Sequence, residues 1–174
     1  RTKSEWVAEG KVLVNEDLLL SVFTRGPANV IDMTYTLVPT SDAVLPRGAF
    51  GGLCARTRVD GKLTFHGPDG VQKLDPPHYL TPESDWPQAA WYDLVNDLND
   101  GPQFGVAVID HKDNPPTTWH NLAVLAMVNP CIISSGDVQL KKGQPLVLRY
   151  RMVAHDGPVP VDLIEKLSAE FGGR

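Results

Sequence analysis

The sequence lacks the features that mark several common classes of protein. It has only two cysteines, too few for a zinc site made of cysteine ligands. No run of lysine and arginine exceeds two residues and the net charge is -5, so we expect no nucleic-acid partner. No stretch of about 18 apolar residues occurs, so we expect no membrane insertion. Cys54 and Cys131 lie far apart, and we predict two buried free thiols, with a disulfide as the alternative.

Glycine and proline are frequent, and their spacing favours β-structure. Fifteen of each are spread through 174 residues and separate many short apolar segments. Residues 30–38 alternate between apolar and polar side chains, as a strand with one wet face does. The hydrophobic fraction of 42% over this length suits one domain with its own core. We predict an all-β fold, an antiparallel β-sandwich, over residues 1–158.

The end of the chain has a different periodicity. Val161, Ile164, Leu167 and Phe171 recur every three to four positions, as on the apolar face of a helix. Gly172 and the glycine after it provide the stop signal. We therefore predict a short amphipathic C-terminal helix within residues 159–174, packed on the sandwich.

Two long loops stand out between the predicted strands. Residues 67–90 are rich in proline and glycine, and loops of this length are often functional. Residues 110–120 form the densest polar cluster and follow an apolar strand at 105–109. Because neighbouring strand residues point to opposite faces, Asp110 and His111 cannot both face one site unless the strand ends between them.

Several side chains near these loops could carry chemistry. An imidazole titrates near neutral pH, so His111 and His120 could act as an acid and base, with Arg56 orienting a hydroxyl or carboxylate. Trp119 and Trp91 could provide platforms for a sugar. The predicted catalytic residues are His111, His120 and Arg56, and the predicted substrate-binding residues are Asp110, Asn114, Trp119, Trp91 and Arg151.

Each of these residues also has a structural interpretation. Histidine and asparagine often only brace a loop, tryptophan often packs in a core, and paired arginines often form a solvated stripe. A metal held by His111, His120 and Asp110 is an alternative, but their spacing matches no compact metal motif. We predict no resident metal and no cofactor.

Several short motifs recur together in this sequence: Gly51-Gly52-Leu53, Arg56, Trp91, Gly105–His111, Asn114-Pro115, Trp119-His120, Asn129-Pro130, Leu148–Arg151 and His155-Asp156-Gly157. Through these residues the chain resembles, over residues 47–157, the bacterial family called "methane oxygenase PmoA-like". The resemblance implies a β-sandwich from proteins that are often secreted or periplasmic, and an association with carbohydrate. It does not imply oxygenase activity, because membrane methane oxygenase subunits span the membrane and this chain has no spanning segment. Lys112 stands where the family usually has proline.

Three hypotheses for function follow. The first is an enzyme that acts on a sugar or sugar derivative through histidine and arginine. The second is a non-catalytic carbohydrate-binding module, and the third is a structural or interaction domain in which these side chains brace loops. The partner expected in the first two is a small molecule or carbohydrate. No carboxylate pair with glycosidase spacing is recognisable, which weakens a hydrolase. The sequence leaves the oligomeric state open.

Overall fold

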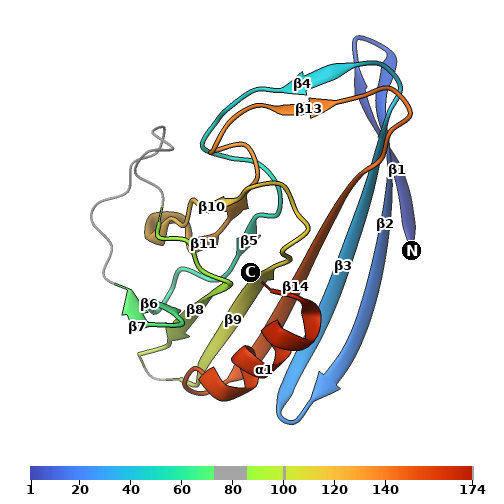
Figure 1. Ribbon diagram of the computed structural model, residues 1–174. Coiled ribbons are helices and arrows are strands. Elements are labelled where there is room, and N and C mark those ends of the chain that lie inside the picture. Colours follow the sequence, from blue (N-terminus) through green and yellow to red (C-terminus); the bar gives the residue numbers. More distant parts are fainter. Residues whose placement is uncertain (73–85, 100, 174) are drawn as a thin grey trace.

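One large antiparallel sheet dominates the fold (Figure 1). The computed structural model describes residues 1–72, 86–99 and 101–173, and within them eight strands form this sheet in the order β1-β2-β3-β14-β9-β8-β6-β7. The strand that comes last in the chain therefore lies near the middle. The eight strands are β1 (Thr2–Ala8), β2 (Lys11–Arg25), β3 (Ala28–Pro39), β6 (Lys62–Gly67), β7 (Gly70–Gln72), β8 (Trp91–Asp97), β9 (Gln103–Asp110) and β14 (Leu146–Asp156).

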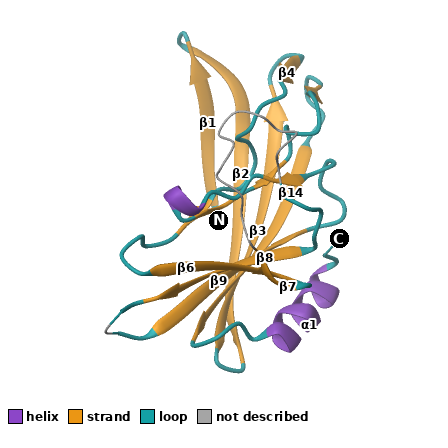
Figure 2. Ribbon diagram, turned by 90° about the vertical axis from the view of Figure 1, so that its left-hand side faces the viewer, coloured by secondary structure: helices purple, strands orange, loops and turns teal. Residues whose placement is uncertain are grey.

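Different elements cover the two faces of this sheet. The helix α1 (Val161–Phe171) packs on one face, where Ile164 and Leu167 join a cluster with Trp91, Ala107 and Val153. Figure 2 shows α1 toward the end of the sheet opposite the β1–β2 turn. Short strands cover the other face, and their side chains join clusters with the alternate residues of the same strands. The central strands are thus buried on both sides.

The covering strands form three two-stranded sheets among the described residues. In β5–β11, Met127 pairs with Arg56, and in β10–β12, Trp119 pairs with Pro130. The paired ranges are β4 (Ala43–Leu45) with β13 (Val138–Leu140), β5 (Ala55–Arg56) with β11 (Met127–Val128), and β10 (Thr118–Trp119) with β12 (Pro130–Cys131).

The predicted β-rich fold with a C-terminal helix is confirmed, but the described residues contain no second large sheet that would make a sandwich. Alternation shows that a strand has one buried face, but it does not identify what covers that face. Here loops and very short ladders cover it. Within the apolar segment 122–128, residues Ala123–Leu125 form a 3-10 turn, which ends at Ala126 in a left-handed conformation (φ 46°) before β11.

The structure also bears on three other sequence predictions. Both cysteines are free, as predicted, but Cys54 is exposed and only Cys131 is buried. No helix in the described ranges is long and apolar enough to cross a membrane. Of the loop predicted at 67–90, residues 70–72 form β7, and residues 73–85 lie outside the described part of the chain.

Candidate functional site

The polar loop after β9 is braced by its own asparagine. Asp110 is fully buried at the end of β9 and accepts a hydrogen bond from Asn114 Nδ2 at 2.7 Å. The same Nδ2 donates to the Arg149 carbonyl oxygen at 2.8 Å, and Asn114 Oδ1 accepts from the Arg149 N–H at 2.8 Å. Asn114 thus ties the loop to β14. These contacts occupy the side chain that was predicted to bind substrate.

His111 packs against the C-terminal end of α1. Its ring meets Phe171 edge-on with a centroid distance of 5.2 Å, and its Nδ1 accepts a hydrogen bond from the Asp113 N–H at 3.1 Å. The next residue of the loop, Lys112, donates its N–H to the Gly172 carbonyl oxygen at 2.9 Å. Burial lowers the pKa of His111, although the Asp113 carboxylate acts in the opposite direction. His111 is therefore held mainly in its neutral form.

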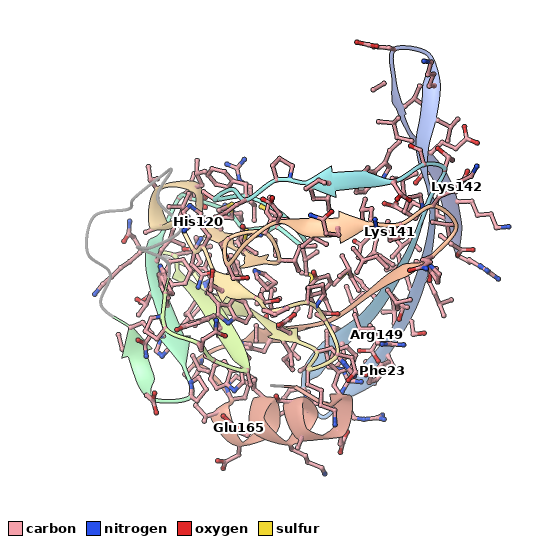
Figure 3. The ribbon with its side chains drawn as sticks, turned by 45° about the horizontal axis from the view of Figure 1, so that its top comes forward. Phe23, His120, Lys141, Lys142, Arg149 and Glu165 are labelled. Atoms are coloured by element: carbon pink, nitrogen blue, oxygen red, sulfur yellow. The ribbon has the colours of Figure 1, made fainter. Side chains whose placement is uncertain are left out.

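His120 lies in a different environment. It is buried, and its ring meets Phe50 edge-on at 4.9 Å. Figure 3 shows His120 beside the short strands, whereas Arg149, whose guanidinium is 3.8 Å from Asp113 in the His111 loop, lies well away from it. The structure therefore does not bring the two predicted acid–base histidines together.

The two predicted tryptophan platforms are both inside the protein. Trp91 is fully buried under α1 and donates its indole N–H to Glu165 at 2.8 Å. Trp119 is fully buried in the cluster on the other face and donates to the Ala89 carbonyl oxygen at 2.9 Å. A side chain without exposed surface offers no face to a sugar in this conformation.

The two predicted arginines also contact the protein itself. Arg151 is 7% exposed and forms a two-pronged ion pair with Asp32 at 2.6 and 2.7 Å. It also donates to the Leu167 carbonyl oxygen at 2.9 Å, which links β14 to α1. Arg56 is exposed on β5 and donates to the Leu125 carbonyl oxygen at 3.2 Å. Among the described residues, no three His, Cys, Asp or Glu side chains are grouped to hold a metal ion.

A mostly apolar cavity of about 490 Å³ lies between the long strands and the short-strand layer. Its wall on the large sheet includes Tyr35, Leu148 and Tyr150. Phe50 and Trp6 are 47% and 40% exposed, so they lie where the cavity meets solvent. The remaining lining residues are Leu37, Leu45, Pro46, Gly51, Gly52, Leu53, Cys54, Ile132 and Ile133.

The Tyr150 hydroxyl is the buried polar group of this cavity. Tyr150 is fully buried, and its hydroxyl proton finds no acceptor among the described residues. Burial raises the pKa of Tyr150 far above its usual range, and the charge of Asp110, its register partner on β9, raises it further. The group therefore stays protonated and can donate a hydrogen bond to a molecule in the cavity.

Glycine at position 52 allows the chain to pass close to this hydroxyl. Gly52 has φ +84°, and a Cβ atom there would lie 2.9 Å from Tyr150 Oη and 2.8 Å from the Pro130 carbonyl oxygen. Asn129 holds the same segment by donating its Nδ2 to the Leu53 carbonyl oxygen at 2.6 Å. Paired glycines permit a close backbone approach, but nothing in the local sequence indicates that Tyr150 is the neighbour.

A second buried polar pair lies on the helix side of the sheet. His155 Nε2 is 2.7 Å from Asp93 Oδ2, and the two side chains are 1% and 0% exposed. They belong to β14 and β8 and meet across β9 at Gly105, where a Cβ atom would overlap the His155 ring. Burial lowers the pKa of His155, but the Asp93 carboxylate outweighs it, so the pKa is raised overall. Sequence reasoning missed this pair because its members are 62 positions apart.

Comparison with known proteins gives a family and no further relatives. No curated protein and no solved structure matches this chain in sequence. A family model described as "Family of unknown function (DUF6807)" matches residues 1–169, nearly the whole length. The chain therefore belongs to the DUF6807 family, a family of unknown function.

Proposed function

We propose that this domain binds a small molecule in the cavity beside Tyr150, without transforming it. The observation that carries the proposal is a fully buried tyrosine hydroxyl, lacking an acceptor for its proton, in a mostly apolar cavity of about 490 Å³. Small-molecule sites are commonly mainly apolar, with a few polar groups that fix orientation. A buried donor left without a partner costs about 1–3 kcal/mol, and a ligand acceptor would relieve that cost.

The lining determines the chemistry of the ligand. Leucine, isoleucine and aromatic side chains form most of the surface, so the body of the ligand should be apolar. Tyr150 can donate one hydrogen bond, so the ligand should carry an acceptor such as a carbonyl or ether oxygen. Among the described residues, no charged side chain belongs to this lining, which disfavours an ionic ligand.

A carbohydrate is the second candidate, and the aromatic side chains of the cavity favour it. Trp6, Tyr35, Phe50 and Tyr150 all line the cavity, and aromatic faces stack on the C–H faces of sugars. This agrees with the carbohydrate association implied by the resemblance to PmoA-like proteins. The small number of hydrogen-bonding side chains in the lining argues for the less polar ligand.

The acid–base hypothesis has less support. His111 packs on Phe171, His120 packs on Phe50, and Arg56 donates to the backbone carbonyl oxygen of Leu125. General acid–base catalysis needs such groups within reach of one reacting atom. A catalytic role for these three residues therefore stays a prediction that requires them to act separately.

Ligand-observed NMR with a matched panel tests the proposal. The panel contains aryl ketones, their hydrocarbon analogues and aryl glycosides, so that the apolar body, the acceptor and the sugar vary separately. We expect ketones to bind better than the hydrocarbons, and Tyr150→Phe to weaken ketone binding about fivefold, since one hydrogen bond contributes about 1 kcal/mol. Preference for the glycosides would favour the carbohydrate.

Tyr35→Phe is the matched control. Tyr35 also lines the cavity, but its hydroxyl donates to Met33 Sδ at 4.0 Å, so its removal should change ketone affinity much less. The proposal would be wrong if no panel member bound. It would also be wrong if the folded Tyr150→Phe variant bound ketones with the same affinity as the wild type.

A further inference from the structure

The cavity beside Tyr150 contains a thiol as well as a hydroxyl. Cys54 is exposed and belongs to the same lining as Tyr150. The other cysteine, Cys131, is buried, and its Sγ lies 3.6 Å from the Gly48 carbonyl oxygen. A molecule that enters the cavity therefore meets one accessible thiol, that of Cys54.

The chain brings this thiol close to the Tyr150 hydroxyl. The backbone of Leu53 lies beside the hydroxyl oxygen, and a Cβ atom on Gly52 would lie 2.9 Å from it. Cys54 is the next residue along, and consecutive Cα atoms are about 3.8 Å apart. The thiol and the hydroxyl are therefore separated by no more than the length of a small molecule.

The two groups match the two ends of one functional group. The Tyr150 hydroxyl has a proton to donate, which suits a carbonyl oxygen. A cysteine sulfur is a soft nucleophile, which suits an electron-poor carbon. An α,β-unsaturated ketone, or enone, has both, since its electrophilic β-carbon is three bonds from its carbonyl oxygen. A saturated ketone uses only the tyrosine.

We propose that the cavity captures aryl enones as adducts of Cys54, with the carbonyl oxygen held by the Tyr150 hydroxyl. The capture rests on the proposed function, because it takes place in the same cavity and uses the same donor. The Cys54 sulfur bonds to the β-carbon, the π electrons of the C=C bond move to form an enolate, and the thiol proton ends on the α-carbon. Nothing leaves and no co-reactant is needed. The reverse step releases the same enone, so the adduct is a form of binding without turnover.

The surroundings of the two groups favour bound enones over other electrophiles. Negative charge develops on the carbonyl oxygen during addition, and a donor already in place stabilises that charge without reorganisation. Partial burial raises the pKa of the Cys54 thiol, while Arg56 acts in the opposite direction, so the thiol is mainly protonated at neutral pH. Unassisted alkylation should therefore be slow, and addition should depend on the ligand being held beside Tyr150.

Intact-mass spectrometry with an aryl vinyl ketone at mildly alkaline pH tests the capture. We expect a single adduct with the mass of the whole enone, a rate that saturates with enone concentration, and competition by the matched saturated ketone. Cys54→Ser should give no adduct. The control is Val44→Cys in the Cys54→Ser chain, because Val44 is 47% exposed and lies outside the cavity lining. Its reaction should stay proportional to enone concentration and ignore the saturated ketone.

Tyr150→Phe tests the part played by the hydroxyl. The saturated rate of enone addition should fall at least about fivefold, since a hydrogen bond to a developing charge is lost. Alkylation of Cys54 by iodomethane, which has no hydrogen-bond acceptor, should be unchanged. Equal slowing of both reagents would show that Tyr150 only shapes the site and would overturn the proposal.

Failure of the capture is distinguishable from failure of the proposed function. If saturated aryl ketones bind in the NMR experiment but Cys54 adds the enone no faster than Val44→Cys does, the capture is wrong and ketone binding stands. If neither the ketones nor the enone occupy the cavity, both are wrong.

Discussion

At the scale of single residues, Gly105 allows two distant strands to share one buried ion pair. Asp93 and His155 meet above it, and no side chain of β9 separates them. Gly105→Ala should lower the free energy of unfolding by about 1–3 kcal/mol, because its methyl group would overlap the His155 ring and lie 2.8 Å from Asp93 Oδ1.

Urea denaturation measures this effect. Gly136→Ala is the control, since no atom lies within 4 Å of the added methyl group and this glycine has no positive φ. Equal stabilities of the two variants would show that the ion pair moves aside without cost.

The same pair should give the stability of the protein a pH dependence. The pKa of His155 is raised above 6.5 in the folded state, so the folded protein holds this proton more tightly than the unfolded chain. The resulting stabilisation is fully present below pH 6.5 and is lost as the pH rises through the raised pKa. Asp93→Asn removes the charge responsible and should flatten this decline in unfolding free energy, measured from pH 6.5 upward.

The titration of His111 does not contribute to a decline in stability above pH 6.5. Its pKa is lowered from 6.5, so its contribution is present above that value and is lost as the pH falls below it. The two histidines therefore act on opposite sides of pH 6.5. A decline of the same slope in Asp93→Asn and wild type above this pH would exclude the pair as its cause.

At the scale of elements, Arg151 joins the helix to the sheet. It pairs with Asp32 on β3 and donates to the Leu167 carbonyl oxygen on α1. Arg151→Ala should lower the unfolding free energy by about 2–3 kcal/mol, a value reduced for the 27% exposure of the Asp32 side chain. It should also speed hydrogen exchange of the α1 amides. Both are measured on the same samples, by urea denaturation and mass spectrometry.

Arg25→Ala is the matched control for this element. Its guanidinium also lies over the Phe23 ring, 4.8 Å from the centroid compared with 5.5 Å for Arg151, but it is exposed. If both variants exchanged their helix amides equally fast, stacking on Phe23 rather than the ion pair would be the stabilising contact.

Elements were easier to predict than the contacts between them. Alternation over residues 30–38 and the three-to-four repeat ending at Phe171 identified β3 and α1, because both patterns are local. The sandwich was an inference about pairing between distant segments, which the pattern does not contain. The same limit applies to the site. Asp110 and Gly52 stood out in the sequence, but the sheet register and the short-strand layer were needed to bring both to Tyr150.

At the scale of the whole molecule, the cavity connects the two layers of the fold. Its lining comes from β3 and β14 on the large sheet and from residues 45–54 and 132–133 in the covering layer. A bound ligand should therefore slow hydrogen exchange in both layers and raise the thermal midpoint. Mass-spectrometric hydrogen exchange with the best-binding aryl ketone checks this. Protection confined to the surface of α1 would contradict the proposed cavity.

The position of β14 also sets the order in which the molecule can assemble. β14 lies between β3 and β9, so it alone joins the early strands to the later ones in the large sheet. Strands β1–β3 and strands β6–β9 can each pair from nearby segments of the chain. The two groups join in the large sheet only when residues 146–156 pair with both β3 and β9. Such long-range pairing slows folding. During synthesis, the two halves of the large sheet cannot pair until the ribosome has released the last strand, and a chain cut short before it lacks the strand that pairs with both.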